Sequence, residues 1–316
     1  EGFCLWDTQQ TDFNAVKRGP GRDLVQEFVD AAREFDLRVG FYYSLMDWHH
    51  PDGGACAYDA AAHRRFIEFT HGCVRELMSN YGHIDILWYD VPKPLESPEG
   101  WQSLTMNQMV RSLQPHILIN NRSRLDEDFS TPEGQVKAAE AGRGWEACMT
   151  FQGRSWGWMP SADIDNWRDR DILRLLNTAC EGAGNLLLNI GPAPDGSAPE
   201  SATRQLHSVG KWLEKNGEAV YGQLERSGIG RASACGRFSR KGSRVYFWVH
   251  VWPGTELGLG GFFTRLKSAS FLHSGEKIDF EQEAYRIKLK NLPEANPDPS
   301  IGVTVIALDF EAPPEH

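Results

Sequence analysis

The feature that most constrains this chain is a regular alternation, over residues 1–221, of short apolar segments with longer amphipathic segments. The short segments are typical of buried strands, and the longer ones repeat apolar residues at helical spacing. Strands are expected near residues 40, 87, 118, 147 and 187, with a strand remnant at Phe3, and helices at 24–35, 58–81, 105–113, 170–182 and 200–216. Because this alternation is typical of parallel strands joined by crossover helices, we predict an α/β domain over residues 1–221.

The pattern changes after Tyr221. Segments such as 244–251, 285–289 and 303–310 are rich in β-forming residues, are separated by turns and show no helical period. We therefore predict a separate all-β domain, a sandwich, over residues 222–316.

The number of strands leaves two architectures open for the first domain. A closed barrel of parallel strands needs eight, and the predicted strands are fewer. The domain is then either an open sheet or a barrel that lacks its first strands. The chain begins at Glu1 without a methionine, so the sequence does not decide between a cytoplasmic and a secreted protein.

Charge and composition exclude several classes of partner. The net charge of −10, from 33 basic and 43 acidic residues, disfavours binding to nucleic acid or to an anionic membrane surface. No apolar run approaches the roughly 18 residues of a membrane span. The six cysteines show no C-x-x-C spacing, and the adjacent His49 and His50 have no third ligand at a suitable spacing, so we predict neither a metal nor a cofactor.

Asp90 follows the apolar strand that begins near Gly82, and Pro92 prevents that strand from continuing. Ligands of parallel sheets bind at the carboxyl ends of the strands, which favours a chemical role for this carboxylate. An Asp after a strand also commonly caps the next turn. From its position alone, both roles remain open.

Eight short blocks, in order along the chain, resemble the α-L-fucosidases of glycoside hydrolase family 29. They are Glu1–Thr8, Gly21–Val25, Tyr42–His49, Ile86–Asp90, Asn120–Arg122, Trp145–Thr150, Ser155–Gly157 and Asn185–Pro192. The resemblance implies a (β/α)8-like barrel, incomplete at its N-terminal side, followed by the β-sandwich. It also implies an enzyme that hydrolyses terminal α-L-fucosides of glycans with retention of configuration, through a fucosyl-enzyme intermediate.

The same resemblance assigns roles to individual residues. Asp90 matches the nucleophile, and the positions that match the fucose pocket are Tyr42, Trp88, Arg122 and Trp156. Glu133 is our first choice for the acid/base and Glu146 is the alternative. A retaining glycosidase needs two carboxyl groups about 5–5.5 Å apart, and a cation such as Arg122 near Asp90 favours its ionised form.

The sequence departs from the family at its start. In the family a pair of histidines precedes the first block, and a further sugar-binding histidine lies on the preceding strands, but none of these is in this sequence. An alternative function is therefore a non-catalytic or impaired fucose-binding or glycan-binding protein of the same fold. If the barrel is open, we expect a homo-oligomer or a complementing N-terminal chain to cover the exposed side.

Overall fold

The computed structural model describes residues 2–151, 155–159, 168–230 and 232–316. The chain forms two compact units, Glu1–Thr131 and Pro132–His316. The domain boundary that the sequence places between residues 221 and 222 stays a prediction.

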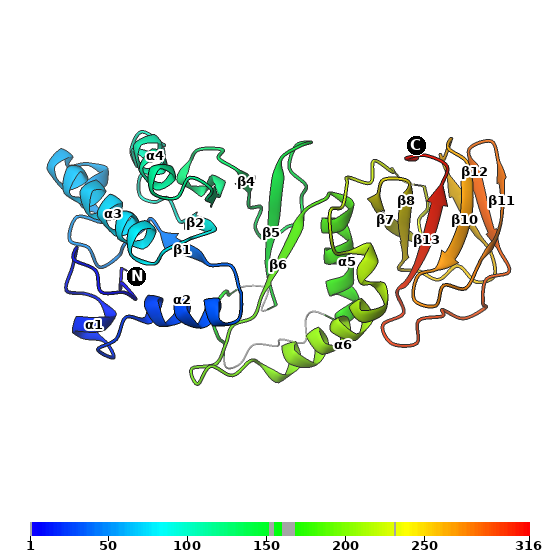
Figure 1. Ribbon diagram of the computed structural model, residues 1–316, viewed down its shortest axis with the longest axis horizontal. Coiled ribbons are helices and arrows are strands. Elements are labelled where there is room, and N and C mark those ends of the chain that lie inside the picture. The colour runs from blue at the N-terminus through cyan, green and yellow to red at the C-terminus, as the bar shows by residue number, and fades with distance from the viewer. Residues whose placement is uncertain (1, 152–154, 160–167, 231) are drawn as a thin grey trace. The chain divides into compact units, whose positions relative to one another are not determined.

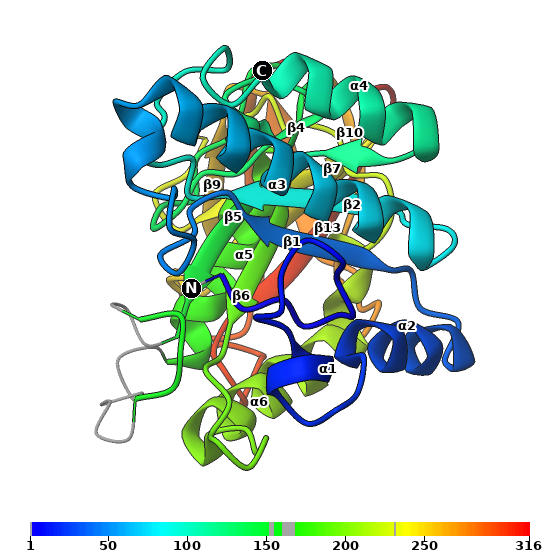
Figure 2. The ribbon, with the colours of Figure 1, turned by 90° about the vertical axis from the view of Figure 1, so that its left-hand side faces the viewer.

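The first unit contains a three-stranded parallel sheet in the order β1-β2-β3. Its strands are β1 (Gly40–Ser44), β2 (Ile86–Asp90) and β3 (Leu118–Ile119), and β4 (Phe129–Ser130) follows them in the chain. The helices are α1 (Ala15–Arg18), α2 (Leu24–Glu34), α3 (Ala60–Asn80) and α4 (Ser103–Leu113). α3 connects β1 to β2 and α4 connects β2 to β3, so each parallel pair has the predicted helical crossover (Figures 1 and 2).

α3 packs on the sheet because its apolar residues repeat at helical spacing. Phe66, Cys73 and Leu77 are buried in the same core as Phe41 of β1 and Leu87 of β2. The helix begins where the side chain of Asp59 accepts a hydrogen bond from the Ala62 backbone N–H. The predicted limits of this helix, residues 58 and 81, lie within two residues of the observed ones, Ala60 and Asn80.

The buried face of α2 differs from the expected one. Its spacing predicts one apolar face made of Leu24, Phe28, Ala31, Ala32 and Phe35, but Phe28 and Phe35 are 56% and 74% exposed. Of this face Ala32 is buried, together with Val29 from the neighbouring stripe. The helix carries two neighbouring apolar stripes, and the contacts of the folded unit select the smaller residues.

The segment before α1 is held by side-chain hydrogen bonds rather than by a strand. The predicted strand remnant at Phe3 is absent from the described residues, where Cys4 forms a single bridge with Asn14. Glu76 of α3 instead accepts four hydrogen bonds, from Trp6 Nε1, Thr8 Oγ1, the Gln9 backbone and Gln10 Nε2. Burial raises the pKa of the Glu76 carboxyl, but the hydrogen bonds together lower that pKa below its usual 4.5. The ionised Glu76 carboxylate therefore stabilises the fold at pH values above 4.5. This contribution is lost as the pH falls through the folded-state pKa of Glu76.

The second unit begins with a parallel pair of strands. β5 (Gly144–Thr150) pairs with β6 (Asn185–Asn189), and α5 (Asp169–Glu181) precedes β6 in the chain. α6 (Glu200–Asn216) follows β6 and has the predicted bounds. Trp212 of α6 and Leu173 of α5 lie in one buried cluster with Trp248 of β8 (Arg244–Val249).

The C-terminal part is a sandwich of two antiparallel sheets, coloured from yellow to red in Figure 1. One sheet has the order β10-β13-β8-β7 and the other β11-β12-β9. Besides β8, the strands are β7 (Gly236–Lys241), β9 (Leu257–Gly260), β10 (Leu266–Phe271), β11 (Asp279–Glu283), β12 (Arg286–Lys290) and β13 (Thr304–Phe310). Residues of both sheets, including Phe247 and Leu289, share one core. The predicted fold class, an α/β part followed by a β-sandwich, is confirmed, whereas the incompleteness of the barrel stays a prediction.

No helix in the described part of the chain is both long enough and apolar enough to cross a membrane.

Candidate active site

Asp90 is the last residue of β2, at the carboxyl end of the parallel sheet. β2 lies between β1 and β3, and the register pairs Tyr42 with Trp88 and Ser44 with Asp90. The chain leaves the sheet after Asp90, so its carboxylate lies where parallel sheets bind their ligands.

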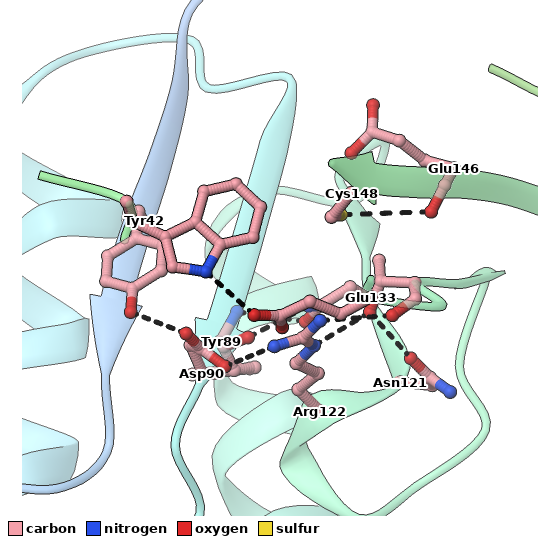
Figure 3. A network of polar contacts seen from close by, with 11 residues as sticks. Tyr42, Tyr89, Asp90, Asn121, Arg122, Glu133, Glu146 and Cys148 are labelled. Atoms are coloured by element: carbon pink, nitrogen blue, oxygen red, sulfur yellow. Dashed lines mark hydrogen bonds and ion pairs between the residues drawn. The ribbon is translucent and has the colours of Figure 1, made fainter. Parts of the chain in front are cut away.

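Each oxygen of the Asp90 carboxylate accepts a hydrogen bond from a different side chain (Figure 3). The Tyr42 hydroxyl donates to Oδ2 over 2.7 Å, and Arg122 Nη1 donates to Oδ1 over 2.6 Å. The side chains of Asp90 and Arg122 are only 19% and 17% exposed, so water screens this ion pair less than a pair on the surface. The two donors stabilise a negative charge on Asp90 and fix the plane of its carboxylate.

Arg122 is itself held in place by several contacts. It belongs to the 3-10 turn η2 (Asn121–Ser123), which follows β3. Its Nε donates to Thr131 Oγ1 over 2.9 Å, and its Nη2 donates to the Thr131 carbonyl over 3.0 Å. The guanidinium also lies over the Trp88 ring, 4.5 Å from the ring centroid. Arg122 is therefore a preorganised donor, which needs little rearrangement when the charge on Asp90 changes.

Asn120 is a positioning residue to which the sequence assigned no role. It is fully buried, directly after β3. Its side chain donates to the Tyr89 carbonyl and accepts from the Tyr89 backbone N–H, both over 2.9 Å. The side-chain amide thus extends the ladder between β2 and β3 and fixes the backbone next to Asp90. The sequence signal that could have indicated this role is the pair Asn120-Asn121, which lies between an apolar strand and Arg122.

Tyr42 and Trp88 form an aromatic wall beside Asp90. Their ring centroids are 5.6 Å apart and their planes differ by 21°. The Tyr42 side chain is 59% exposed. An exposed aromatic surface next to a carboxylate suits the apolar face of a sugar ring.

Glu133 lies in the second unit, beside β5. The Gly134 N–H donates to the Cys148 carbonyl over 3.0 Å, and the Cys148 N–H donates to the Pro132 carbonyl over 2.8 Å. These two hydrogen bonds place Glu133 opposite Cys148. Trp156 Nε1 donates to Glu133 Oε1 over 2.9 Å, so two residues to which the sequence assigns separate roles are in direct contact.

Glu146, the alternative acid/base, is the third residue of β5 and is partly buried. It lies two residues before Cys148, which corresponds to about 7 Å along the strand, farther from the carboxyl end than Glu133. Figure 3 shows its carboxylate pointing away from Glu133. The two glutamates therefore occupy different positions along β5.

Among residues 2–151, 155–159, 168–230 and 232–316, no three His, Cys, Asp or Glu side chains are grouped so that they could hold a metal ion. His49 stacks on Phe13 with ring centroids 3.7 Å apart. His50 Nδ1 accepts a hydrogen bond from the Asp52 backbone over 3.1 Å. The two adjacent histidines thus have separate structural contacts.

Comparison with known proteins gives one consistent relationship. The family model described as Alpha-L-fucosidase matches residues 1–218. Human plasma alpha-L-fucosidase is 31% identical over 235 residues, which cover 70% of this chain and 50% of the human protein. An alpha-L-fucosidase of Branchiostoma floridae is 29% identical over 279 residues, 82% of this chain and 61% of that protein. The chain thus spans between half and two thirds of the length of these curated relatives.

Solved structures agree with the sequence relatives. Alpha-L-fucosidase isoenzyme 1 from Paenibacillus thiaminolyticus aligns with a TM-score of 0.85 and 30% identity, over 98% of this chain and 80% of that one. A family 29 alpha-L-fucosidase from Bacteroides thetaiotaomicron, trapped as a covalent intermediate with 2-fluoro-fucosyl fluoride, aligns with a TM-score of 0.85 and 25% identity, over 98% of this chain and 76% of that one. With a family model that matches more than half of its residues, this chain belongs to the alpha-L-fucosidase family, glycoside hydrolase family 29.

Proposed function

We propose that this chain carries the catalytic machinery of a retaining exo-α-L-fucosidase, which acts on terminal α-L-fucosides of oligosaccharides or glycoconjugates. The observation that carries this proposal is the Asp90 carboxylate at the end of β2, with Arg122 on one oxygen and Tyr42 on the other. A carboxylate that is largely buried, paired with a cation and fixed in orientation is suited to act as the nucleophile toward the anomeric carbon of a bound sugar.

In the first chemical step, a carboxylate oxygen of Asp90 forms a bond to the anomeric carbon as the glycosidic bond breaks. The departing oxygen takes a proton from the second carboxyl group, which we assign to Glu133. In the second step, that carboxylate accepts a proton from water, the water oxygen bonds to the anomeric carbon, and Asp90 leaves. Arg122 then stabilises the negative charge that returns to Asp90.

The remaining pocket residues bind the sugar in this proposal. Trp88 and Trp156 offer apolar ring surfaces to the C–H face and the methyl group of fucose, and Tyr42 supplies a hydroxyl at the pocket wall beside Asp90. Glu133 is favoured over Glu146 because it lies closer to the carboxyl end of β5 and holds the Trp156 indole. The expected separation between the acid/base and Asp90 is about 5–5.5 Å.

Trapping of the intermediate tests this function. We expect the chain to hydrolyse 2-chloro-4-nitrophenyl α-L-fucoside, and 2-fluoro-fucosyl fluoride to inactivate it with time. Mass spectrometry of the digested protein should find one fluorofucosyl group on the peptide that contains Asp90, and none in Asp90→Asn. A folded protein that binds L-fucose but does not turn over the aryl fucoside would instead be a binding protein.

We further propose that another polypeptide segment covers the first unit, supplied by a second copy of this chain or by a complementing N-terminal chain. β1 is an edge of the sheet within the described residues. Next to it lies a cavity of about 580 Å³ lined by Phe3, Leu5 and Phe28, among others, and Leu5 and Phe28 are 50% and 56% exposed. Light scattering of residues 1–316 should therefore show a complex, or activity should rise when the complementing chain is added. A fully active monomer would contradict this proposal.

A further inference from the structure

Side chains at the C-terminal ends of β5 and β6 form hydrogen bonds to the backbone of Ser155 and Trp156. Asn189 is the last residue of β6 and lies opposite Thr150, the last residue of β5. Asn189 Nδ2 donates to the Trp156 carbonyl over 2.9 Å and to Thr150 Oγ1 over 3.2 Å. The Thr150 hydroxyl donates to the Ser155 carbonyl over 2.8 Å. Two side chains at the ends of neighbouring strands therefore fix the backbone of Ser155 and Trp156.

Gly191 brings the same two segments together independently of these side chains. A Cβ atom at this position would lie 2.6 Å from the Gly157 carbonyl oxygen and 2.8 Å from the Trp158 nitrogen. Both are backbone atoms, so any larger residue would push the segment away. The close approach of the chain after β6 to the residues after Trp156 thus requires glycine.

The position of Trp156 in turn fixes a hydrogen bond to the carboxyl group of Glu133. Its indole N–H donates to Glu133 Oε1 over 2.9 Å, while the backbone on either side of Glu133 is hydrogen-bonded to Cys148. An indole N–H can only donate, so Oε1 accepts this hydrogen bond. In a protonated carboxyl group the carbonyl oxygen is the better acceptor, so this contact favours the form of Glu133 in which Oε2 carries the proton. The contact therefore biases which oxygen holds the proton and in which direction it points.

We propose that Asn189, together with Thr150, is a positioning residue that holds Trp156 so that its indole orients the carboxyl group of Glu133 for proton transfer. This inference rests on the proposed function, in which Glu133 is the acid/base. Asn189 itself need not contact the sugar. Its loss should impair the steps that need the Glu133 proton and leave the attack by Asp90 largely intact.

Two substrates that differ in their need for an acid separate this role from a general loss of structure. Phenoxide is a poor leaving group and needs a proton, whereas 2-chloro-4-nitrophenoxide departs without one. Because a general acid contributes about 10²–10⁴-fold, we expect Asn189→Leu to lower kcat/KM for phenyl α-L-fucoside by about 10–100-fold. For 2-chloro-4-nitrophenyl α-L-fucoside the loss should stay below about threefold.

Asn185→Leu is the matched control, because Asn185 is the exposed first residue of the same strand. It should change neither rate constant by more than about twofold, as is usual for surface substitutions. Thr150→Val and Trp156→Phe should show the same dependence on the leaving group as Asn189→Leu. If Asn189→Leu does not fold, Thr150→Val makes the same test, with circular dichroism and thermal unfolding as checks.

Three results would overturn the inference. Equal losses on both substrates would mean that Asn189 acts through the general stability of the site, and no loss on either would mean that it has no role. In both cases turnover by the unmodified chain keeps the proposed function intact. If the unmodified chain hydrolyses neither fucoside, the proposed function fails, and this inference fails with it.

Discussion

Replacing Asp90 with glycine is expected to lower turnover of 2-chloro-4-nitrophenyl α-L-fucoside by at least about 10⁴-fold, or about 5 kcal/mol of transition-state stabilisation. The variant lacks the group that forms the covalent bond and the carboxylate that pairs with Arg122. A good leaving group does not compensate, because the missing group is the nucleophile and not the acid.

Sodium azide should restore part of this rate. An azide ion fits the space that the carboxylate vacates, and Arg122 and Tyr42 remain as donors that favour an anion there. Azide attacks the face of the sugar that Asp90 would have attacked, so the product should be β-L-fucosyl azide, identified by NMR. Asp36→Gly is a suitable control, since this exposed residue has a φ of 53°, where glycine is well accepted. Rescue at another carboxylate but not at Asp90 would assign the nucleophile elsewhere.

The periodic parts of the fold could be predicted from the sequence. The bounds of α6 and the strand ending at Asp90 follow from local patterns, because length, apolar spacing and Pro92 act within a few residues. The face of α2 could not be predicted in the same way. Phe28 and Val29 belong to adjacent stripes with the same spacing, so only the tertiary partners decide which stripe is buried.

The candidate site shows the same division. The resemblance to the family named Asp90, Tyr42, Trp88 and Arg122, and these four residues lie together in the first unit. Two residues that hold the backbone of the candidate site were missed. Asn120 bonds to the backbone of Tyr89, 31 positions away, and Asn189 bonds to the backbone of Trp156, 33 positions away. Such contacts depend on strand register and on loop paths, which no local pattern in the sequence encodes.

The roles of the two glutamates lead to the second prediction. Glu133→Ala should lower kcat/KM for phenyl α-L-fucoside by about 10²–10⁴-fold, because the departing phenoxide then leaves without a proton. For 2-chloro-4-nitrophenyl α-L-fucoside the same constant should change far less. Its kcat should still fall, since the second step needs Glu133 as a base to activate water. Azide needs no base, so it should raise that kcat and give α-L-fucosyl azide, with the configuration of the substrate.

Glu146→Ala is the matched variant in this experiment, because Glu146 lies in β5, Glu133 lies beside that strand, and the substitution is the same. Glu146 points away from Glu133 and lies farther from the carboxyl end of the strand, so its loss should affect both substrates alike (Figure 3). Azide should then have no effect. The two azide products also separate the carboxylates by stereochemistry, since the nucleophile variant gives the β-anomer and the acid/base variant the α-anomer. If the dependence on the leaving group and the α-azide product appear in Glu146→Ala and not in Glu133→Ala, Glu146 is the acid/base.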